Sequence, residues 1–200
     1  MDLDLRWAAE LCPLPSRLSP HADTVGRCLP AWVRRHGLVT DETSLRRLSE
    51  GRIARYAGRL YPDADPDDLR CLAALFTWFF LLDDACDGAD GPRPAQITAL
   101  RAEVLRVLDG QAPPDTPTRT AALLRMLAEL WRLPQRRMPP SWRARFVDTV
   151  AHHLDGVLVE ASNKVSGHRP AVAEYLTLRR ATSAAYVSYT LTEFATGQPI

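Results

Sequence analysis

A nearly uninterrupted apolar stretch, residues 72–82, is the feature of this 200-residue chain that most constrains its fold. Every residue in it except Thr77 is apolar, so a helix through it would be hydrophobic on all sides and would have to be buried. The stretch is too short to cross a bilayer, which takes about 20 residues. It ends at Asp83 and Asp84, and Asp87 follows at helical spacing. The buried helix must therefore end at a polar site.

The three aspartates would crowd together on such a helix and repel one another. They also stand near its C-terminus, which Gly88 is expected to cap, and the helix dipole disfavours negative charge there. A divalent cation would remove both conflicts, whereas the alternative is that residues 83–90 simply begin a solvated loop. An EF-hand calcium loop does not fit, because Ala85 and Pro94 stand at ligand positions. We expect Mg²⁺, which proteins hold with few carboxylates together with substrate phosphates.

Composition limits the classes of partner. The 46% hydrophobic content is enough for one domain with a core, and the net charge of +1 gives no reason to expect nucleic acid or an anionic membrane as a partner. The cysteines show no C-x-x-C pairing, so we expect reduced thiols; they are Cys12, Cys28, Cys71 and Cys86. The N-terminus lacks the basic start and apolar core of a signal peptide, and no window is long enough for a transmembrane helix. We therefore expect a cytoplasmic protein.

The rest of the sequence has helical periodicity and predicts an all-α fold. Residues 1–20 carry three prolines and no clear period, so we expect an N-terminal strap followed by one domain over residues 21–200. The expected helices cover residues 21–36, 43–61, 66–87, 95–108, 118–133, 141–165 and 169–196. Asp65 and the two acids after it are interpreted as N-terminal caps, Ser141 as the cap of its helix, and residues 133–140 as a solvated basic loop.

The last expected helix contains a second informative pattern. Arg179 would lie on a stripe of apolar and small polar residues, where a solvated arginine would be out of place. The stripe consists of Tyr175, Leu176, Thr182, Ser183 and Tyr186. We expect Arg179 to bind an anion, and its planar guanidinium suits bidentate contact with phosphate. An ion pair with a core acid such as Glu193 or Glu160 is the alternative.

Two other metal patterns are weaker. Asp148, His152 and Asp155 recur at i, i+4 and i+7, but no further ligand spacing accompanies them, and exposed polar faces produce such patterns by chance. A di-iron carboxylate bundle would need Glu-x-x-His, which the sequence lacks. The aspartates that end the apolar stretch remain the expected metal site.

Taken together, the two stretches resemble the class I terpene synthases of bacteria. Residues 79–88, Phe-Phe-Leu-Leu-Asp-Asp-x-x-Asp-Gly, are similar to the aspartate-rich motif of that family. Residues 174–182, Glu-Tyr-x-x-Leu-Arg-Arg-x-Thr, resemble its diphosphate-sensor region, and residues 160–164 resemble the segment before the sensor. The likeness covers most of residues 20–197. It implies an all-α helical bundle of the isoprenoid synthase type.

The resemblance also implies an activity, namely the Mg²⁺-dependent ionisation and cyclisation of a linear isoprenyl diphosphate with release of diphosphate. Farnesyl or geranylgeranyl diphosphate would be the substrate. Asp83, Asp84 and Asp87 would hold the Mg²⁺, with three ions in a complete site. The diphosphate would contact Arg179 as the sensor, Thr182 would be the linker, and Ser183 would lie near the effector position.

Further residues are expected to bind the substrate. Arg180 follows the sensor in the sequence, and the resemblance implies that it is a second substrate-binding arginine. Phe76, Phe79 and Phe80 are expected aromatic walls for the carbocation, because ring faces attract cations. A plain core position is the alternative for each of the three phenylalanines.

One departure from the family pattern is serious. The second metal motif of the family is an Asn or Asp followed by Ser or Thr and then Glu, and it is absent after the sensor. The most similar pattern begins with Asn163 and Ser166 but has Pro170 at its third position. Family domains are also longer, so the resemblance implies an incomplete bundle that takes its missing ligands from a C-terminal segment or from a second chain, as in a homodimer. We expect this chain alone to bind magnesium diphosphate weakly and to catalyse poorly. A chain-elongating prenyltransferase and a non-catalytic helical interaction module remain alternatives.

Overall fold

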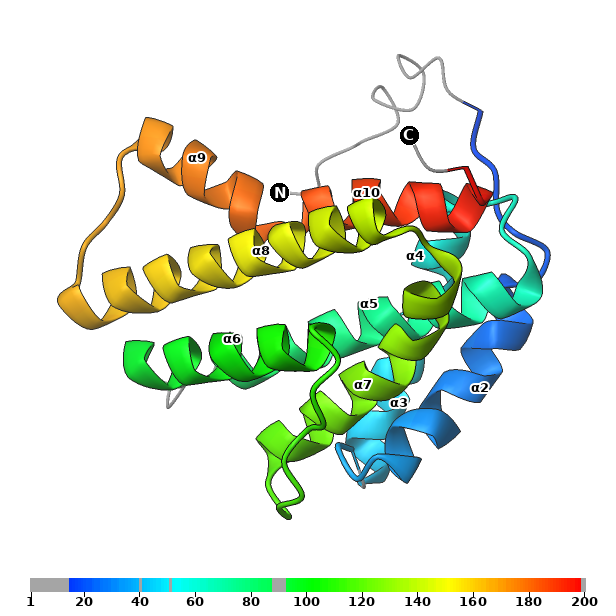
Figure 1. Cartoon of the computed structure of the whole chain (residues 1–200), viewed down its shortest axis with the longest axis horizontal. Coiled ribbons are helices and arrows are strands. Elements are labelled where there is room, and N and C mark those ends of the chain that lie inside the picture. Colours follow the sequence, from blue (N-terminus) through cyan, green and yellow to red (C-terminus); the bar gives the residue numbers. More distant parts are fainter. Residues whose placement is uncertain (1–14, 40, 51, 88–92, 199–200) are drawn as a thin grey trace.

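The computed structural model describes residues 15–39, 41–50, 52–87 and 93–198, and within these ranges the secondary structure is entirely helical (Figure 1). The all-α prediction is confirmed. The helices are α2 Ala22–Arg35, α3 Glu42–Glu50, α4 Ile53–Leu60, α5 Pro66–Asp87, α6 Pro94–Leu108, α7 Arg119–Arg137, α8 Pro140–Ser166, α9 Val172–Thr182 and α10 Ala185–Thr196. No helix within the described ranges has the length and apolar character that a bilayer span requires.

Helix α5 is the core helix, as its apolar sequence predicts. It contacts α2, α4, α7 and α10, and its bounds are those expected from the sequence. Thr77, the polar residue within its apolar stretch, is fully buried, and its hydroxyl donates to the carbonyl of Ala73 at 2.8 Å. Trp78 is also fully buried, and its indole N–H donates to the carbonyl of Leu123 on α7 at 2.9 Å. Each buried polar group is therefore satisfied without interrupting the apolar contact.

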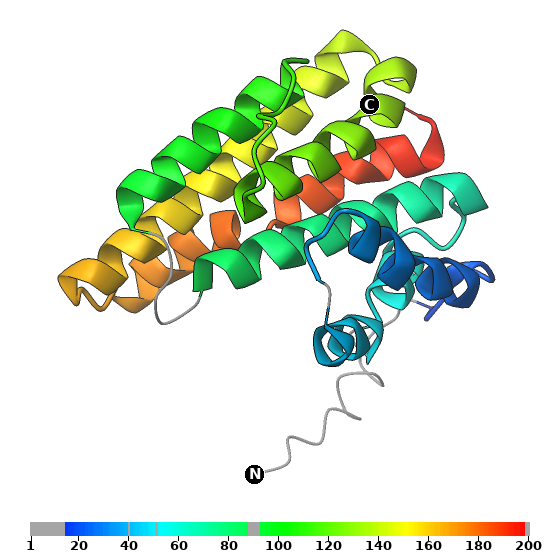
Figure 2. The ribbon, with the colours of Figure 1, turned by 90° about the horizontal axis from the view of Figure 1, so that it is seen from below.

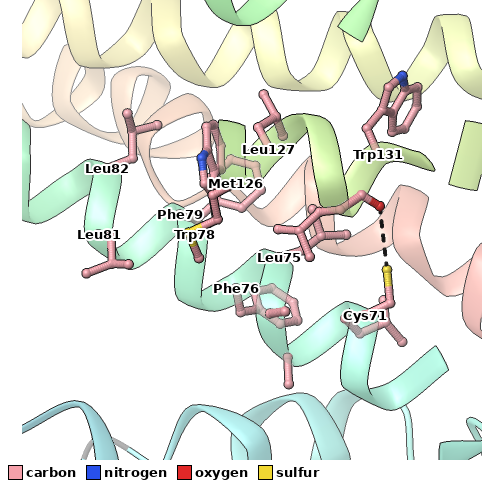
Figure 3. Close-up of a cluster of buried hydrophobic side chains, with 14 of the residues drawn as sticks. Cys71, Leu75, Phe76, Trp78, Phe79, Leu81, Leu82, Met126, Leu127 and Trp131 are labelled. Carbon is pink, nitrogen blue, oxygen red and sulfur yellow. Dashed lines mark hydrogen bonds between the residues drawn. The ribbon is translucent and has the colours of Figure 1, made fainter. Parts of the chain in front are cut away.

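The apolar side chains of α5 and α7 interdigitate along most of their length (Figure 3). Figure 3 shows Leu75, Phe79 and Leu82 of α5 beside Met126 and Leu127 of α7. Farther along, rings of α7 and α8 stack, and the residues involved are Trp131, Trp142 and Phe146. These contacts fix α5 against α7 and α7 against α8, and α5 and α8 both line the site described below.

The N-terminus of α5 is fixed by an ion pair that the sequence did not predict. Asp65 caps the helix as expected, because its Oδ1 accepts the backbone N–H groups of Asp67 and Asp68 at 2.9 and 3.0 Å. Asp68, however, is buried and accepts a hydrogen bond from Arg137 at 2.5 Å. Arg137 also donates to the carbonyl of Phe194 at 2.8 Å and lies over its ring. The arginine joins the ends of α5, α7 and α10.

The expected basic loop at residues 133–140 is wrong. Helix α7 continues to Arg137 with Pro134 inside it. Pro134 is buried, its carbonyl accepts the backbone N–H of Met138 at 2.9 Å, and the Arg137 ion pair holds the last turn. Tertiary contacts thus outweigh the lost backbone donor of the proline. The next helix begins one residue earlier than expected, with Pro139 at the cap position in place of Ser141.

Two of the expected helices are each broken in the middle. Residues 43–61 form α3 and α4, and residues 169–196 contribute α9 and α10. At the first break Arg52 has φ of 51°, and at the second Ala184 has φ of 53°. Such left-handed conformations are uncommon for residues with a Cβ. Gly51 stands next to Arg52 and could have marked the first break in the sequence, whereas the second break has no glycine to mark it.

The described part of the N-terminal strap, residues 15–20, lies along α4. The backbone N–H of Ser19 donates to the carbonyl of Gly58 at 3.0 Å, and Arg59 donates to the Ser16 hydroxyl at 2.6 Å. The thiols of Cys28 and Cys71 are free, as expected, whereas Cys12 lies outside the described residues.

Figures 1 and 2 show where the last helices lie. Helix α8 contacts both α6 and α9, and Figure 1 shows α9 slanting back to meet α8 near its middle. Helix α10 returns along α8 and contacts α5 as well. The C-terminal end of α5 and helix α9 are thereby brought to the same end of the bundle (Figure 2).

Candidate active site

A cavity of about 680 Å³ opens at this end of the bundle. Its lining comes from α4, α5, α6, α8, α9 and α10 and from the junction between α9 and α10. It contains Asp83 of α5 together with Arg179 and Thr182 of α9 and Ser183 after them. The structure therefore brings one of the predicted metal ligands to the same cavity as the predicted sensor.

The acidic end of the cavity is the last turn of α5, which contains no basic residue. Asp83 and Asp84 are both exposed. Asp83 lines the cavity, whereas Asp84 lines a neighbouring hollow of about 370 Å³ with Arg119. The side chain of Asp87 and the expected cap Gly88 lie outside the described residues.

The described carboxylates are the kind of ligand that Mg²⁺ binds, but they are fewer than a complete metal site needs. Carboxylate oxygens are the ligands that Mg²⁺ takes from proteins, usually one or two of them together with water and phosphate oxygens. Among the residues whose side chains the structure describes, no three His, Cys, Asp or Glu side chains cluster closely enough to hold a metal ion. Asp83 thus offers an oxygen ligand of the kind that Mg²⁺ takes, whereas Asp84 lines the neighbouring hollow.

The sensor end of the cavity is the last turn of α9. Nη1 of Arg179 lies 3.4 Å from Oγ1 of Thr182, the predicted linker. Glu193, one of the two acids considered as its alternative partner, pairs instead with Arg145 at 2.6 Å. Arg179 is exposed, and Arg180 next to it does not line the cavity. The substrate-binding role of Arg180 stays a prediction.

The predicted stripe around Arg179 differs from expectation in two ways. The helix ends at Thr182, so Tyr186 belongs to α10 and does not share a helix face with Arg179. Tyr175 and Leu176 are 49% and 56% exposed, so the stripe does not lie in the core of the described residues. Ser183 is the C-terminal cap of α9 and lies directly before the break at Ala184.

The predicted aromatic walls all line the cavity. Phe76 and Phe79 are buried, and Phe80 is 48% exposed. The ring of Tyr56 on α4 meets Phe76 edge to face, with centroids 5.2 Å apart. A contact with a carbocation stays a prediction for each phenylalanine.

Comparison with known proteins agrees with this geometry. A sequence family described as terpene synthase family 2, C-terminal metal binding, matches residues 74–200. The chain belongs to the terpene synthase family. The resemblance inferred from the aspartate motif and the sensor is therefore confirmed.

Other terpene synthases are similar over much of this chain. The pristinol synthase of Streptomyces pristinaespiralis is 32% identical over 177 residues, which are 88% of this chain and 47% of that protein. The (+)-T-muurolol synthase of Roseiflexus castenholzii is 35% identical over 198 residues, 98% of this chain and 59% of that protein. The chain thus spans between 47% and 59% of the length of these two relatives.

Solved terpene synthase structures share the fold. Germacradien-4-ol synthase from Streptomyces citricolor superposes with a TM-score of 0.81 at 26% identity, covering 94% of this chain and 62% of that one. Linalool/nerolidol synthase from Streptomyces clavuligerus gives a TM-score of 0.82 at 25% identity, with the same coverage of 94% and 62%. The all-α bundle of the class I terpene synthase type is thereby confirmed.

In this member of the terpene synthase family, one buried titratable residue of the site was not predicted from the sequence. His153 on α8 lines the cavity and is only 4% exposed. Its Nδ1 lies 3.1 Å from the carbonyl oxygen of Ala181, and its ring meets Phe79 edge to face. Burial lowers the pKa of His153. Its spacing one and two turns before Val157 and Glu160, which also line the cavity, is the signal that could have found it.

The weaker metal pattern on α8 does not assemble. Asp155 forms an ion pair with Arg101 on α6 at 2.7 Å, and His152 packs its ring against Tyr186. The polar face of α8 is thus used for contacts with neighbouring helices.

Proposed function

We propose that residues 21–200 form the N-terminal portion of a single terpene synthase domain that ionises and cyclises a linear isoprenyl diphosphate. Diphosphate is released, and farnesyl or geranylgeranyl diphosphate is the substrate. The observation that carries the proposal is that Asp83 and Arg179 line one cavity. An acidic group and an arginine on facing helices are what a metal–diphosphate pair requires.

Asp83, Asp84 and Asp87 would hold the Mg²⁺, with three ions in a complete site. Bound there, Mg²⁺ would supply Lewis-acid stabilisation of the negative charge that develops on the departing diphosphate. The turn that holds the aspartates lies at the C-terminus of α5, where the helix dipole disfavours negative charge. A bound cation would offset that cost.

The chain's own residues would bind and orient the diphosphate. Arg179 presents an exposed guanidinium at the cavity and would donate to two phosphate oxygens at once. Thr182, 3.4 Å from Nη1 of Arg179, would orient that guanidinium. Ser183 lies where the helix breaks, and there its backbone can approach the diphosphate. Donors placed in advance where charge develops lower the barrier to ionisation.

The hydrocarbon part of the substrate would lie against Phe76, Phe79 and Phe80. A volume of about 680 Å³ falls within the usual range for small-molecule sites. The buried faces of Phe76 and Phe79 would keep water from the carbocation and stabilise it through their ring electrons.

Apolar side chains on the last helices support a larger domain. Val165, Val172 and Tyr189 are 71%, 76% and 68% exposed, and they lie on α8, α9 and α10. Large apolar side chains exposed on successive helices suit a packing interface. A further segment of the same domain, or a second copy in a homodimer, would cover it and supply the remaining metal ligands.

Incubation with Mg²⁺ and geranyl, farnesyl or geranylgeranyl diphosphate tests the function. We expect slow, Mg²⁺-dependent release of diphosphate together with a cyclic product detected by gas chromatography and mass spectrometry. An Asp83→Ala protein should release none. A longer isoprenyl diphosphate made only when isopentenyl diphosphate is added would favour a chain-elongating prenyltransferase. A non-catalytic interaction module would show neither release nor thermal stabilisation by substrate and Mg²⁺.

A further inference from the structure

The junction between α9 and α10 is an unusual backbone element. Helix α9 ends at Thr182, Ser183 follows as its cap, and Ala184 has φ of 53° before α10 begins. A residue with a Cβ rarely adopts this left-handed conformation unless its surroundings hold it there. The same break leaves the last carbonyls of α9 without partners inside the helix. The junction therefore needs support from outside α9.

His153 on α8 supplies that support. The carbonyl oxygen of Ala181 accepts the backbone N–H of Ala184 at 3.2 Å and lies 3.1 Å from Nδ1 of His153. A carbonyl oxygen can only accept, so Nδ1 must carry a proton, and in the neutral ring the lone pair is then on Nε2. Both lone pairs of this orphan carbonyl are thereby used, one of them by a different helix.

The ring of His153 also contacts the other half of the site. It meets the ring of Phe79 on α5 edge to face, with centroids 5.5 Å apart and an interplanar angle of 77°. Phe79 lies one helical turn before Asp83. One buried side chain thus contacts both the helix that carries the aspartates and the helix that carries the sensor.

Gly156, three residues after His153 on α8, brings α8 and α9 into close contact. A Cβ at Gly156 would lie 2.7 Å from Cβ of Ala181 and 3.0 Å from Cγ2 of Thr182. Only glycine leaves room for this approach. The short distance between the two backbones is what places the Ala181 carbonyl within reach of His153.

We propose that His153 is a positioning residue for the diphosphate sensor: its Nδ1–H group holds the end of α9 while its ring edge rests on Phe79, so that Arg179, Thr182 and Ser183 keep one spacing from the end of α5. The positioning role rests on the proposed function, whereas the contact between His153 and Ala181 is present in the protein without any ligand. It assigns His153 no contact with the reacting atoms.

The tautomer of His153 gives a spectroscopic test. In a protein labelled with ¹⁵N at histidine, NMR at neutral pH should show His153 as a neutral ring protonated at Nδ1. A neutral histidine in water prefers the other tautomer, so a merely buried ring without the Ala181 contact would not give this signature. A ring protonated at Nε2 would overturn the proposal.

Matched substitutions give a structural test by hydrogen exchange and mass spectrometry. His153→Phe keeps a ring against Phe79 and removes the donor, whereas His153→Asn keeps a donor near the place of Nδ1. His152→Phe is the control, because His152 is exposed and contacts Tyr186 and not Ala181. Exchange in a peptide spanning residues 179–188 should become about tenfold faster in His153→Phe, and His153→Asn should restore most of the protection.

The outcomes separate this inference from the proposed function. Exchange at the junction that is the same in His153→Phe as in His152→Phe would overturn the positioning role, as would failure of His153→Asn to restore protection. Neither experiment contains magnesium or diphosphate, so a chain that failed to bind substrate would leave both results unchanged. If His153→Phe does not fold by circular dichroism, the tautomer and the His153→Asn protein still decide the question.

Discussion

Asp83 on α5 and Arg179 on α9 line the same cavity, although the whole of α6, α7 and α8 separates them in the chain. Neither residue is unusual by itself, since aspartates and arginines are mostly exposed in folded proteins. Their meeting across one cavity gives the arrangement its chemical meaning. A metal ion at the carboxylate and a phosphate at the guanidinium would occupy adjacent positions there.

The two adjacent arginines should differ in their effect on diphosphate binding. Arg179 lines the cavity and Arg180 does not, although both are exposed. Loss of a charged hydrogen-bonding partner typically weakens binding by about 1.5–3 kcal/mol, so Arg179→Met should lose about tenfold to a hundredfold in affinity. Titration calorimetry with Mg²⁺ and a farnesyl diphosphate analogue measures it. Equal losses in Arg179→Met and Arg180→Met would give Arg180 the substrate-binding role as well.

Alanine at Gly156 should destabilise the protein. The added Cβ would overlap Ala181 at 2.7 Å, and overpacking of this kind costs about 1–3 kcal/mol. Gly26→Ala is the matched control, since a Cβ there would meet Ala54 at an ordinary 3.5 Å. In a helix that change should leave stability unchanged or raise it by up to about 1 kcal/mol. Urea unfolding of both proteins compares the free energies, and equal effects would argue against a tight α8–α9 contact.

Removal of the Arg137 side chain should destabilise the protein through Asp68. The Asp68 side chain is 4% exposed, and its burial raises its pKa, while the hydrogen bond from Arg137 opposes the rise. Arg137→Met would leave a buried carboxyl without this partner and lower the free energy of unfolding by about 2–3 kcal/mol. Arg70→Met is the control, because the side chains of Arg70 and Asp67 are 59% and 75% exposed. Its effect should stay below about 0.5 kcal/mol by thermal unfolding.

Stability should decrease with acidity in a way that depends on His153. Burial lowers its pKa from the ordinary value of 6.5, so the unfolded chain binds the proton more readily than the folded one. Its contribution is therefore complete above about pH 6.5 and is lost as the pH falls from there towards the folded pKa. The range from pH 7.5 to 5 brackets the ordinary pKa of about 6.5. Across this range the free energy of unfolding should fall more steeply in the unchanged protein than in His153→Asn. His36, whose pKa burial also lowers, contributes equally to both proteins, so parallel curves would contradict the prediction.

Helix α5 and its acidic end could be predicted from the sequence, because a fully apolar run followed by carboxylates has few physical solutions. The break at Ala184 could not, since a residue with a Cβ gives no local sign of a left-handed conformation, whereas Gly51 next to Arg52 was an available sign of the first break. Helix α7 passes through Pro134 for tertiary reasons, which the proline rule ignores. His153 was missed because its partner is a backbone carbonyl, and every residue has one.

The most direct test of the shared Asp83–Arg179 site is thermal unfolding with Mg²⁺ and a non-reactive farnesyl diphosphate analogue, added separately and together. A ligand present at one hundred times its dissociation constant would stabilise the fold by about 2.7 kcal/mol. A ligand that this chain binds weakly would raise the unfolding midpoint by less at millimolar concentration. We predict a higher midpoint only with both ligands, and none in Asp83→Asn or Arg179→Met. An equal rise of the midpoint in all three proteins would contradict the account. So would the absence of a rise in the unchanged protein at the highest soluble concentration of the ligand.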